Sequence, residues 1–146
     1  MEKTLVLLKP DCIQRGLVGE IITRLENKGL KIVHIAEVLL DEDDVKFLYG
    51  KYAKERFFPG IVQFMTSGIS IYIALEGEKA VETVRALIGA PEPTPGTIRG
   101  DYAIRVEIPD NMTVWHNIIH ASEGITEARS ELYYFNEKKK MEFEKT

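Results

Sequence analysis

Four side chains in this sequence could bind and transfer a phosphoryl group, although they lie far apart along the chain. Lys9 follows a short apolar run, and Arg85 lies in an amphipathic stretch. Arg99 lies beside Gly100, and His120 follows two isoleucines. The unperturbed pKa of an imidazole is about 6.5, so at about pH 7 most rings have a free lone pair that can attack phosphorus. Lysine and arginine can neutralise phosphate oxygens, and arginine can bind two of them at once.

Each of these residues alone also fits an ordinary core or surface position, so the elements that carry them must be considered together. Apolar runs rich in branched residues predict strands at residues 3–8, 30–40, 69–75 and about 113–121. Apolar residues at helical spacing predict helices at residues 16–29, 80–88 and 125–135. In this arrangement a strand end carries Lys9, and the last core strand carries His120 out of the core at its end.

Residues 41–66 interrupt the alternation of strands and helices. The four carboxylates of residues 41–44 favour the first turn of a helix, and the turn at residues 57–60 opens a second one. With this inserted helical hairpin set aside, the order is strand, helix, strand, strand, helix, strand. That order predicts an α+β, ferredoxin-like fold, with a four-stranded antiparallel sheet and helices on one face. We expect one domain over residues 1–146, with a loosely ordered tail at about 136–146.

The segment before the last strand has its own signals. Residues 90–96 contain three prolines, which exclude a helix or a central strand and predict a loop. Ile104, Val106 and Ile108 then alternate in strand fashion, and residues 109–111 predict a turn.

Composition limits the function classes. The 146 residues are 45% apolar and have a net charge of −4, so the surface as a whole repels polyanions and a phosphate site must be a local cluster of cations. The single cysteine, Cys12, excludes an internal disulfide framework and is expected to be inert. Without an apolar run of about 18 residues or a signal peptide, we expect a cytoplasmic protein that contacts no membrane.

Further residues could complete a phosphate site. Glu131 lies one helix after His120 and could orient the imidazole, and the Phe57-Phe58 pair could stack on a base or belong to the core. His34 and His116 are interpreted as structural. The sequence contains neither a Gly-x-x-x-x-Gly-Lys-Ser/Thr loop nor a dinucleotide glycine fingerprint, so side chains must bind the phosphates.

Several motifs, taken in order, resemble the nucleoside diphosphate kinase family along nearly the whole chain. They are Thr4-Leu5-Val6-Leu7-Leu8-Lys9-Pro10-Asp11, Arg15-Gly16-Leu17-Val18-Gly19-Glu20-Ile21-Ile22, Arg56-Phe57-Phe58-Pro59, Pro95-Gly96-Thr97-Ile98-Arg99-Gly100-Asp101 and Asn117-Ile118-Ile119-His120-Ala121-Ser122. The resemblance implies a ping-pong enzyme that moves the γ-phosphate of a nucleoside triphosphate, typically ATP, to a nucleoside diphosphate, with low base specificity.

The resemblance also implies catalytic roles. His120 matches the nucleophile that carries the phosphate between the two half-reactions. Glu131 and Ser122 match the residues that hold the imidazole, and Tyr49 matches a tyrosine near the γ-phosphate. A magnesium ion is implied between the phosphates of the nucleotide, with no metal ligand from the protein.

Nucleotide-binding roles follow in the same way. Lys9 and Asn117 match the contacts to the ribose hydroxyls, and Phe57 matches the ring that stacks on the base. Arg85 and Arg99 match the phosphate clamps. The implied partners are nucleoside di- and triphosphates and further copies of the chain, in a homo-oligomer that is a hexamer or a tetramer built from dimers.

The sequence departs from the family pattern near the phosphates. Pro91 stands where the family usually has a threonine that contacts phosphate, so that contact is lost or moved to Thr94. The proline loop is about three residues shorter than usual, the segment 107–116 is longer, and Glu123 replaces a common aspartate. Because the proline loop and the carboxyl terminus shape subunit contacts in this family, the oligomeric state stays open.

Two other classes of protein compete with the kinase. Ferredoxin-like sheets can bind nucleic acid by stacking bases on exposed aromatic residues. The acidic net charge and the lack of aromatic residues at alternate positions of one strand argue against specific nucleic-acid binding. An inactive assembly protein on the same fold is the other alternative, and the presence of His120, Glu131 and Asn117 together argues against it.

Overall fold

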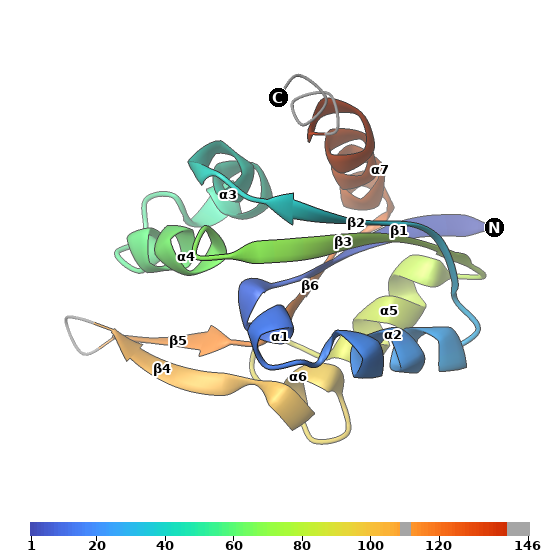
Figure 1. Cartoon of the computed structure of the whole chain (residues 1–146), viewed down its shortest axis with the longest axis horizontal. Coiled ribbons are helices and arrows are strands. Elements are labelled where there is room, and N and C mark those ends of the chain that lie inside the picture. The colour runs from blue at the N-terminus through green and yellow to red at the C-terminus, as the bar shows by residue number, and fades with distance from the viewer. Residues whose placement is uncertain (109–111, 140–146) are drawn as a thin grey trace.

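The computed structural model describes residues 1–108 and 112–139, and its centre is a four-stranded antiparallel sheet (Figure 1). The strands lie in the order β2-β3-β1-β6. They are β1 (Glu2–Leu8), β2 (Lys31–Leu39), β3 (Ile69–Gly77) and β6 (Ile119–Ala121). This order confirms the ferredoxin-like fold that the sequence predicted.

Two helices cover one face of the sheet, α2 (Val18–Asn27) and α5 (Ala80–Ile88). Their apolar residues recur every three or four positions, so each helix has one stripe directed at the sheet. Ile21 and Leu25 of α2 and Val84 of α5 belong to the same buried cluster as the β1 residues Val6 and Leu8. These are the two helices of the predicted βαββαβ order.

The expectation of helices on one face only is wrong. Leu5 and Leu7 of β1 alternate with Val6 and Leu8, and all four are fully buried, so both faces of β1 must be covered. The second face is covered by three helices and a single 3₁₀ turn. These are α3 (Glu42–Tyr49), η1 (Gly50–Tyr52), α4 (Phe58–Met65) and α7 (Ile125–Tyr133). The inserted helical hairpin is therefore part of the core.

The predicted last strand, residues 113–121, is divided in two. Met112–His116 (β5) pairs with Ile104–Ile108 (β4) in a separate two-stranded sheet, and only the three residues of β6 join the main sheet. The break falls at Ile118, which has a positive φ of 61°. A branched residue rarely adopts this conformation, so the sequence pattern gives no sign of the break.

The chain end is more ordered than predicted over residues 136–139. Tyr134–Lys139 (η2) forms a π-helical continuation of α7 in which Phe135 is buried. The ammonium group of Lys139 lies 2.8 Å from the carboxylate of Asp44. The rest of the predicted loose tail, residues 140–146, and the predicted turn at 109–111 lie outside the described residues. Within the described part of the chain, no helix has the length and apolar character needed to cross a membrane.

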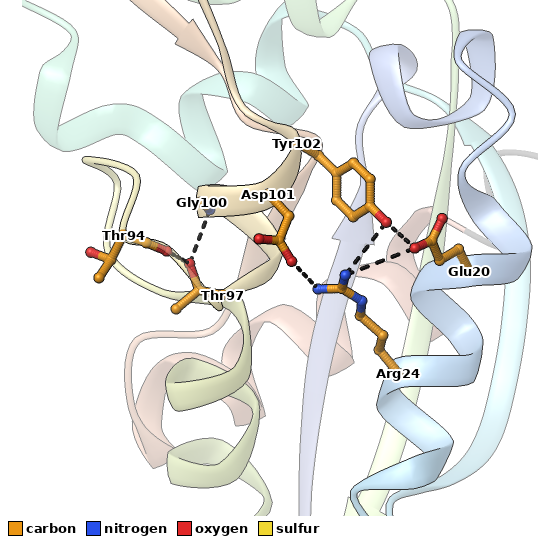
Figure 2. A network of polar contacts seen from close by, with 7 residues as sticks. All are labelled: Glu20, Arg24, Thr94, Thr97, Gly100, Asp101 and Tyr102. Carbon is orange, nitrogen blue, oxygen red and sulfur yellow. Dashed lines mark hydrogen bonds and ion pairs between the residues drawn. The ribbon is translucent and has the colours of Figure 1, made fainter.

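Two short helices fix the segments beside the sheet edge, α1 (Pro10–Gln14) and α6 (Ile98–Tyr102). Neither was predicted as a helix. A network around α6 joins it to α2, as Figure 2 shows, with Arg24 at its centre. The Arg24 guanidinium lies 2.8 Å from Asp101 and faces the Tyr102 ring, whose hydroxyl donates to Glu20. This network holds α6, and with it Arg99, against the body of the protein.

The proline loop packs closely against α6. The Thr97 hydroxyl donates to the Thr94 carbonyl over 2.6 Å and accepts from the amide of Gly100 over 2.9 Å (Figure 2). A β-carbon at Gly100 would lie only 1.7 Å from the Thr94 carbonyl oxygen. Only glycine fits here, because backbone occupies the space of a side chain.

We therefore expect Gly100→Ala to lower the free energy of unfolding by about 1–3 kcal/mol, the usual effect of forcing a group into occupied space. Urea denaturation measures the change. Gly19→Ala is the matched control, because Gly19 lies in a helix and a β-carbon there would meet nothing within 4 Å. If the two variants were equally stable, the proline loop would accommodate the added β-carbon without a loss of folding free energy.

Candidate active site

A cavity of about 290 Å³ lies among β6, α4 and the hairpin of β4 and β5. One part of its lining is charged and polar: Lys9, Tyr49, Lys51, Arg85, Arg99, Asn117, His120 and Glu123. Another part is mostly apolar and aromatic: Phe57, Ile61, Phe64, Met65, Val114, Trp115 and His116. The structure thus brings most of the residues predicted for the site to one cavity.

His120 is oriented by a buried hydrogen-bond chain. It lies in the middle of β6 rather than past its end, and it is only 8% exposed. Its Nε2 lies 2.7 Å from Oε1 of Glu131 on α7, and the Ser122 hydroxyl donates to the same oxygen over 3.0 Å. His120 and Ser122 are two positions apart on an extended segment, so both side chains point to α7. Because Glu131 binds Nε2, the nitrogen left for chemistry is Nδ1.

Lys9 and Asn117 form a second buried pair. Lys9 Nζ donates to Asn117 Oδ1 over 2.7 Å, and both residues are 6% exposed. Burial, together with the positive charge of Arg99, lowers the pKa of Lys9 from 10.5 to about 7. Asp11 acts in the opposite direction but is outweighed. The lysine is therefore poised to gain a proton when an anion enters the cavity.

Tyr49 connects the two pairs. Its ring meets the His120 ring edge-on at 5.5 Å between centroids, and Lys9 Nζ lies 5.5 Å from the centre of its ring. The hydroxyl is buried without a hydrogen-bond partner among the described residues, and burial raises its pKa. A buried hydroxyl with no partner is costly, and a ligand oxygen in the cavity would satisfy it.

The two arginines differ in how firmly they are held. Arg99 donates over 3.0 Å to the carbonyl of Gly89 and over 3.0 Å to that of Ile119, while its buried Nε has no partner within the described residues. Burial lowers its pKa. Arg85, on α5, is exposed and lines the cavity wall. Arg99 is thus part of the framework as well as the wall.

The two adjacent aromatic candidates, Phe57 and Phe58, lie in different environments. Phe58 is 6% exposed and belongs to the core, whereas Phe57 lines the cavity with its ring tilted against Tyr52. Pro91 also lines the cavity. Thr94 is not in the cavity lining, and its carbonyl accepts hydrogen bonds within the proline loop. Another threonine, Thr113 of β5, does line the cavity.

Sequence reasoning missed two contacts at the cavity. Lys51 and Glu123 form an ion pair of 2.5 Å between η1 and the segment after β6, and both residues line the cavity. His116, predicted to be structural, also lines it, and its ring stacks on Phe64 of α4 at 3.8 Å with an angle of 10°. No local signal marks either contact, because the partners are far apart in sequence and meet only through the fold.

The other predicted structural residues lie elsewhere. His34 Nε2 is 3.0 Å from the Tyr72 hydroxyl, on the sheet. Cys12 is buried, and burial together with Asp11 raises its pKa to about 12, which keeps the thiol protonated. Over residues 1–108 and 112–139, no group of three or more His, Cys, Asp or Glu side chains could hold a metal ion.

A buried, oriented imidazole beside a cluster of cations, with an aromatic wall in the same cavity, is the arrangement of a nucleotide phosphotransferase that works through histidine. The family model of nucleoside diphosphate kinase matches residues 2–141. The chain belongs to the nucleoside diphosphate kinase family.

Relatives with that name cover most of the chain. The nucleoside diphosphate kinase of Methanosarcina barkeri is 44% identical over 135 residues, which are 90% of this chain and 85% of that protein. The enzyme of Thermobifida fusca is 41% identical over 138 residues, covering 92% of this chain and 96% of its own. The solved structure of the Halobacterium salinarum enzyme, in complex with CDP, is 40% identical with a TM-score of 0.78 and covers 92% of this chain and 86% of its own.

The lowered pKa of Lys9 predicts a pH dependence of stability. Between pH 7 and 10.5 the unfolded chain holds the Lys9 proton and the folded chain does not. The free energy of unfolding of the wild type should therefore rise with pH in this window, relative to Lys9→Met, by up to about 1.4 kcal/mol per pH unit. Below pH 7 both states are protonated and the difference levels off.

Urea denaturation from pH 6 to 10 measures this difference. Lys3→Met is the control, since Lys3 lies on β1, the strand that ends directly before Lys9, and its side chain is 58% exposed. If wild type and Lys9→Met change in parallel over the whole range, Lys9 does not titrate as the buried geometry implies.

Proposed function

We propose that His120 is the nucleophile of this nucleoside diphosphate kinase and that the residues around it form the nucleotide site. The observation that carries this proposal is the buried chain from Ser122 through Glu131 to His120, which leaves Nδ1 as the free ring nitrogen in a cavity with cations. A carboxylate only accepts hydrogen bonds, so Glu131 keeps the proton on Nε2 and the lone pair on Nδ1. The same carboxylate stabilises the positive charge that the ring gains during attack.

Two balanced half-reactions follow. In the first, the Nδ1 lone pair of His120 forms a bond to the γ-phosphorus, and the bond from that phosphorus to the β–γ bridging oxygen breaks. The nucleoside diphosphate leaves with the electron pair of the broken bond. In the second, a terminal oxygen of another diphosphate attacks the phosphorus, and the N–P bond breaks to return the neutral imidazole. No water takes part, and the two steps are chemically the reverse of one another.

The nucleotide-binding roles in this proposal are those that the family resemblance implies, and all of the residues concerned line the cavity. Arg85 and Arg99 bind the phosphate oxygens, where guanidinium groups stabilise the transferring charge. Phe57 stacks on the base, which contributes similarly for every base because each has a π-face. Lys9 and Asn117 contact the ribose hydroxyls. This division agrees with low base specificity, since hydrogen bonds are directed at the sugar and phosphates that all nucleotides share.

Tyr49 completes the phosphate end. Its buried hydroxyl lacks a partner among the described residues and lies in a ring that contacts His120. In our proposal this hydroxyl donates to an oxygen of the γ-phosphate, so the cost of burying it is offset only when the substrate is present.

Magnesium enters as part of the substrate in this proposal. Phosphate oxygens are the hard ligands that Mg²⁺ prefers, and the ion commonly keeps waters and binds through the phosphates of the nucleotide. The bound ion neutralises phosphate charge beside the two arginines. The protein's own contribution is the orientation of His120 and the cationic wall.

We further infer that the protein works as a cytoplasmic homo-oligomer, a hexamer or a tetramer built from dimers. The support is the open edge of the sheet at β2, where exposed apolar side chains gather. They are Val33, Ile35 and Leu39, with Ile69 on the neighbouring strand. Exposed apolar side chains on an edge strand favour association with another chain.

The central experiment is transfer of label from γ-labelled ATP. Label should become bound to the wild-type protein, resist alkali but not acid, and leave when GDP is added. His120→Ala should take up no label and still bind ADP, because the binding contacts lie on other residues. His34→Ala is the control for a histidine outside the cavity. Labelling of His120→Ala, or an acid-stable adduct, would show that another residue carries the phosphate.

The arginines should separate binding from stability. Arg85→Ala should lower kcat/KM by about 10- to 150-fold, the effect of one lost charge-assisted hydrogen bond, without lowering the melting temperature. Arg99→Ala should lower kcat/KM by a similar factor and also lower the melting temperature, because two backbone carbonyls lose their donor. Steady-state kinetics and thermal unfolding test both, with the exposed Arg129→Ala as control. If Arg85→Ala or Arg99→Ala had the kcat/KM of the wild type, that arginine would not bind the phosphates.

A further inference from the structure

His116 is a polar residue of the cavity wall to which the proposed mechanism gives no role. It is the last residue of β5 and lies directly before Asn117 in the sequence. Its ring stacks face to face on Phe64 of α4, so the hairpin and the helix are joined across the cavity. The stack uses the face of the ring and leaves its edge, where both nitrogens lie, free of the contact. Neither nitrogen has a hydrogen-bond partner within the described part of the chain.

The ring has both a donor and an acceptor to offer. Burial lowers the pKa of His116, so the imidazole is neutral at neutral pH. A neutral imidazole has one N–H donor and one nitrogen lone pair, which together match a hydroxyl group. A packing role alone needs neither, since a phenylalanine would stack equally well on Phe64.

The position of His116 indicates which part of the nucleotide, the base or the sugar, its ring nitrogens contact. His116 lies beside Asn117, which is bonded to Lys9, and this pair marks the sugar contacts of the proposed site. A kinase that serves several bases cannot depend on hydrogen bonds to one base edge, because such sites reject nucleotides that lack the matching group. Every ribonucleotide, in contrast, offers the same hydroxyls. An unpartnered donor and acceptor at this place therefore fit the sugar.

We propose that His116 binds a ribose hydroxyl of the nucleotide and is thus a sugar-binding residue of the kinase. This inference rests on the nucleotide site proposed above and adds a third sugar contact to Lys9 and Asn117. It assigns a ligand contact to β5, and so to the two-stranded sheet beside the main one.

His116→Phe is the decisive variant, because it keeps the stack on Phe64 and removes both hydrogen-bonding nitrogens. Calorimetric titration with ADP and Mg²⁺ measures affinity without turnover, since no phosphate donor is present. ADP should bind about 2- to 12-fold more weakly, the loss of one neutral hydrogen bond. Binding of tripolyphosphate, which has no sugar, should not change. The loss should be equal for ADP, GDP and CDP.

Deoxynucleotides identify the hydroxyl. The wild type should bind either 2′-deoxy-ADP or 3′-deoxy-ADP more weakly than ADP, and this difference should be smaller in His116→Phe by the same factor of about 2 to 12, since the contacts from Lys9 and Asn117 remain. His116→Gln, which keeps a donor and an acceptor without the aromatic ring, should bind ADP more tightly than His116→Phe. Arg105→Ala on β4 is the control from the same hairpin, because Arg105 is exposed and does not line the cavity. An unchanged emission maximum of Trp115, the only tryptophan, shows that the hairpin keeps its place in each variant.

Three results would overturn the inference. Wild-type affinity of His116→Phe for ADP would make His116 a packing residue, and a loss confined to one base would mean that it reads a base edge. If His116→Phe bound ADP more tightly than His116→Gln, the contribution of His116 to ADP affinity would come from its stack on Phe64 and not from hydrogen bonds. Failure of the proposed function is distinct, since it would appear as absent phosphate transfer by the wild type whatever the binding data show.

Discussion

The left-handed turn at Ile118 is the constraint on which the cavity depends. Its amide donates to a carboxylate oxygen of Asp11, and its carbonyl accepts from the amide of Lys9. Ile118 is completely buried, so these bonds and the packing around it offset the strain of a branched residue at positive φ. The turn directs the chain from the hairpin into the main sheet and places Asn117 and His120 on opposite sides of one bend. Strain of this kind is often found where a structure must hold reactive groups in place.

The site is built from polar groups that are costly to bury. Lys9, Asn117, His120, Ser122 and Glu131 are each under a tenth exposed. Most have a partner within the chain, but the hydroxyl of Tyr49 and Nε of Arg99 have none among the described residues. A ligand that meets these atoms gains more than it would at a solvated surface, since they are buried and have no hydrogen-bond partner among the described residues. In the proposed nucleotide site, these two groups would contribute part of the affinity for the phosphates.

The sequence predicted the sheet and its strand order because those features depend on local patterns that repeat over many residues. The site residues could be named because long motifs resemble a known family. Three features had no local signal. The helices over residues 41–66 and 125–135 were predicted, but their place on the second face follows from burial of both Leu5 and Val6 in one strand. The break at Ile118 follows from a rare backbone conformation, and the His116–Phe64 stack from contact between distant segments. Each of these is decided by tertiary packing, which overrides local preference.

The contact between His120 and Glu131 has a consequence for synthesis on the ribosome. The carboxylate that orients the imidazole comes from α7, the last α-helix, and Lys9 bonds to a residue 108 positions further along the chain. A nascent chain can fold α2 and α5 against β1 and β3 before either contact exists. His120 is then held in place only after α7 has emerged. A chain that ends between residues 120 and 131 would have the imidazole without the carboxylate that orients it.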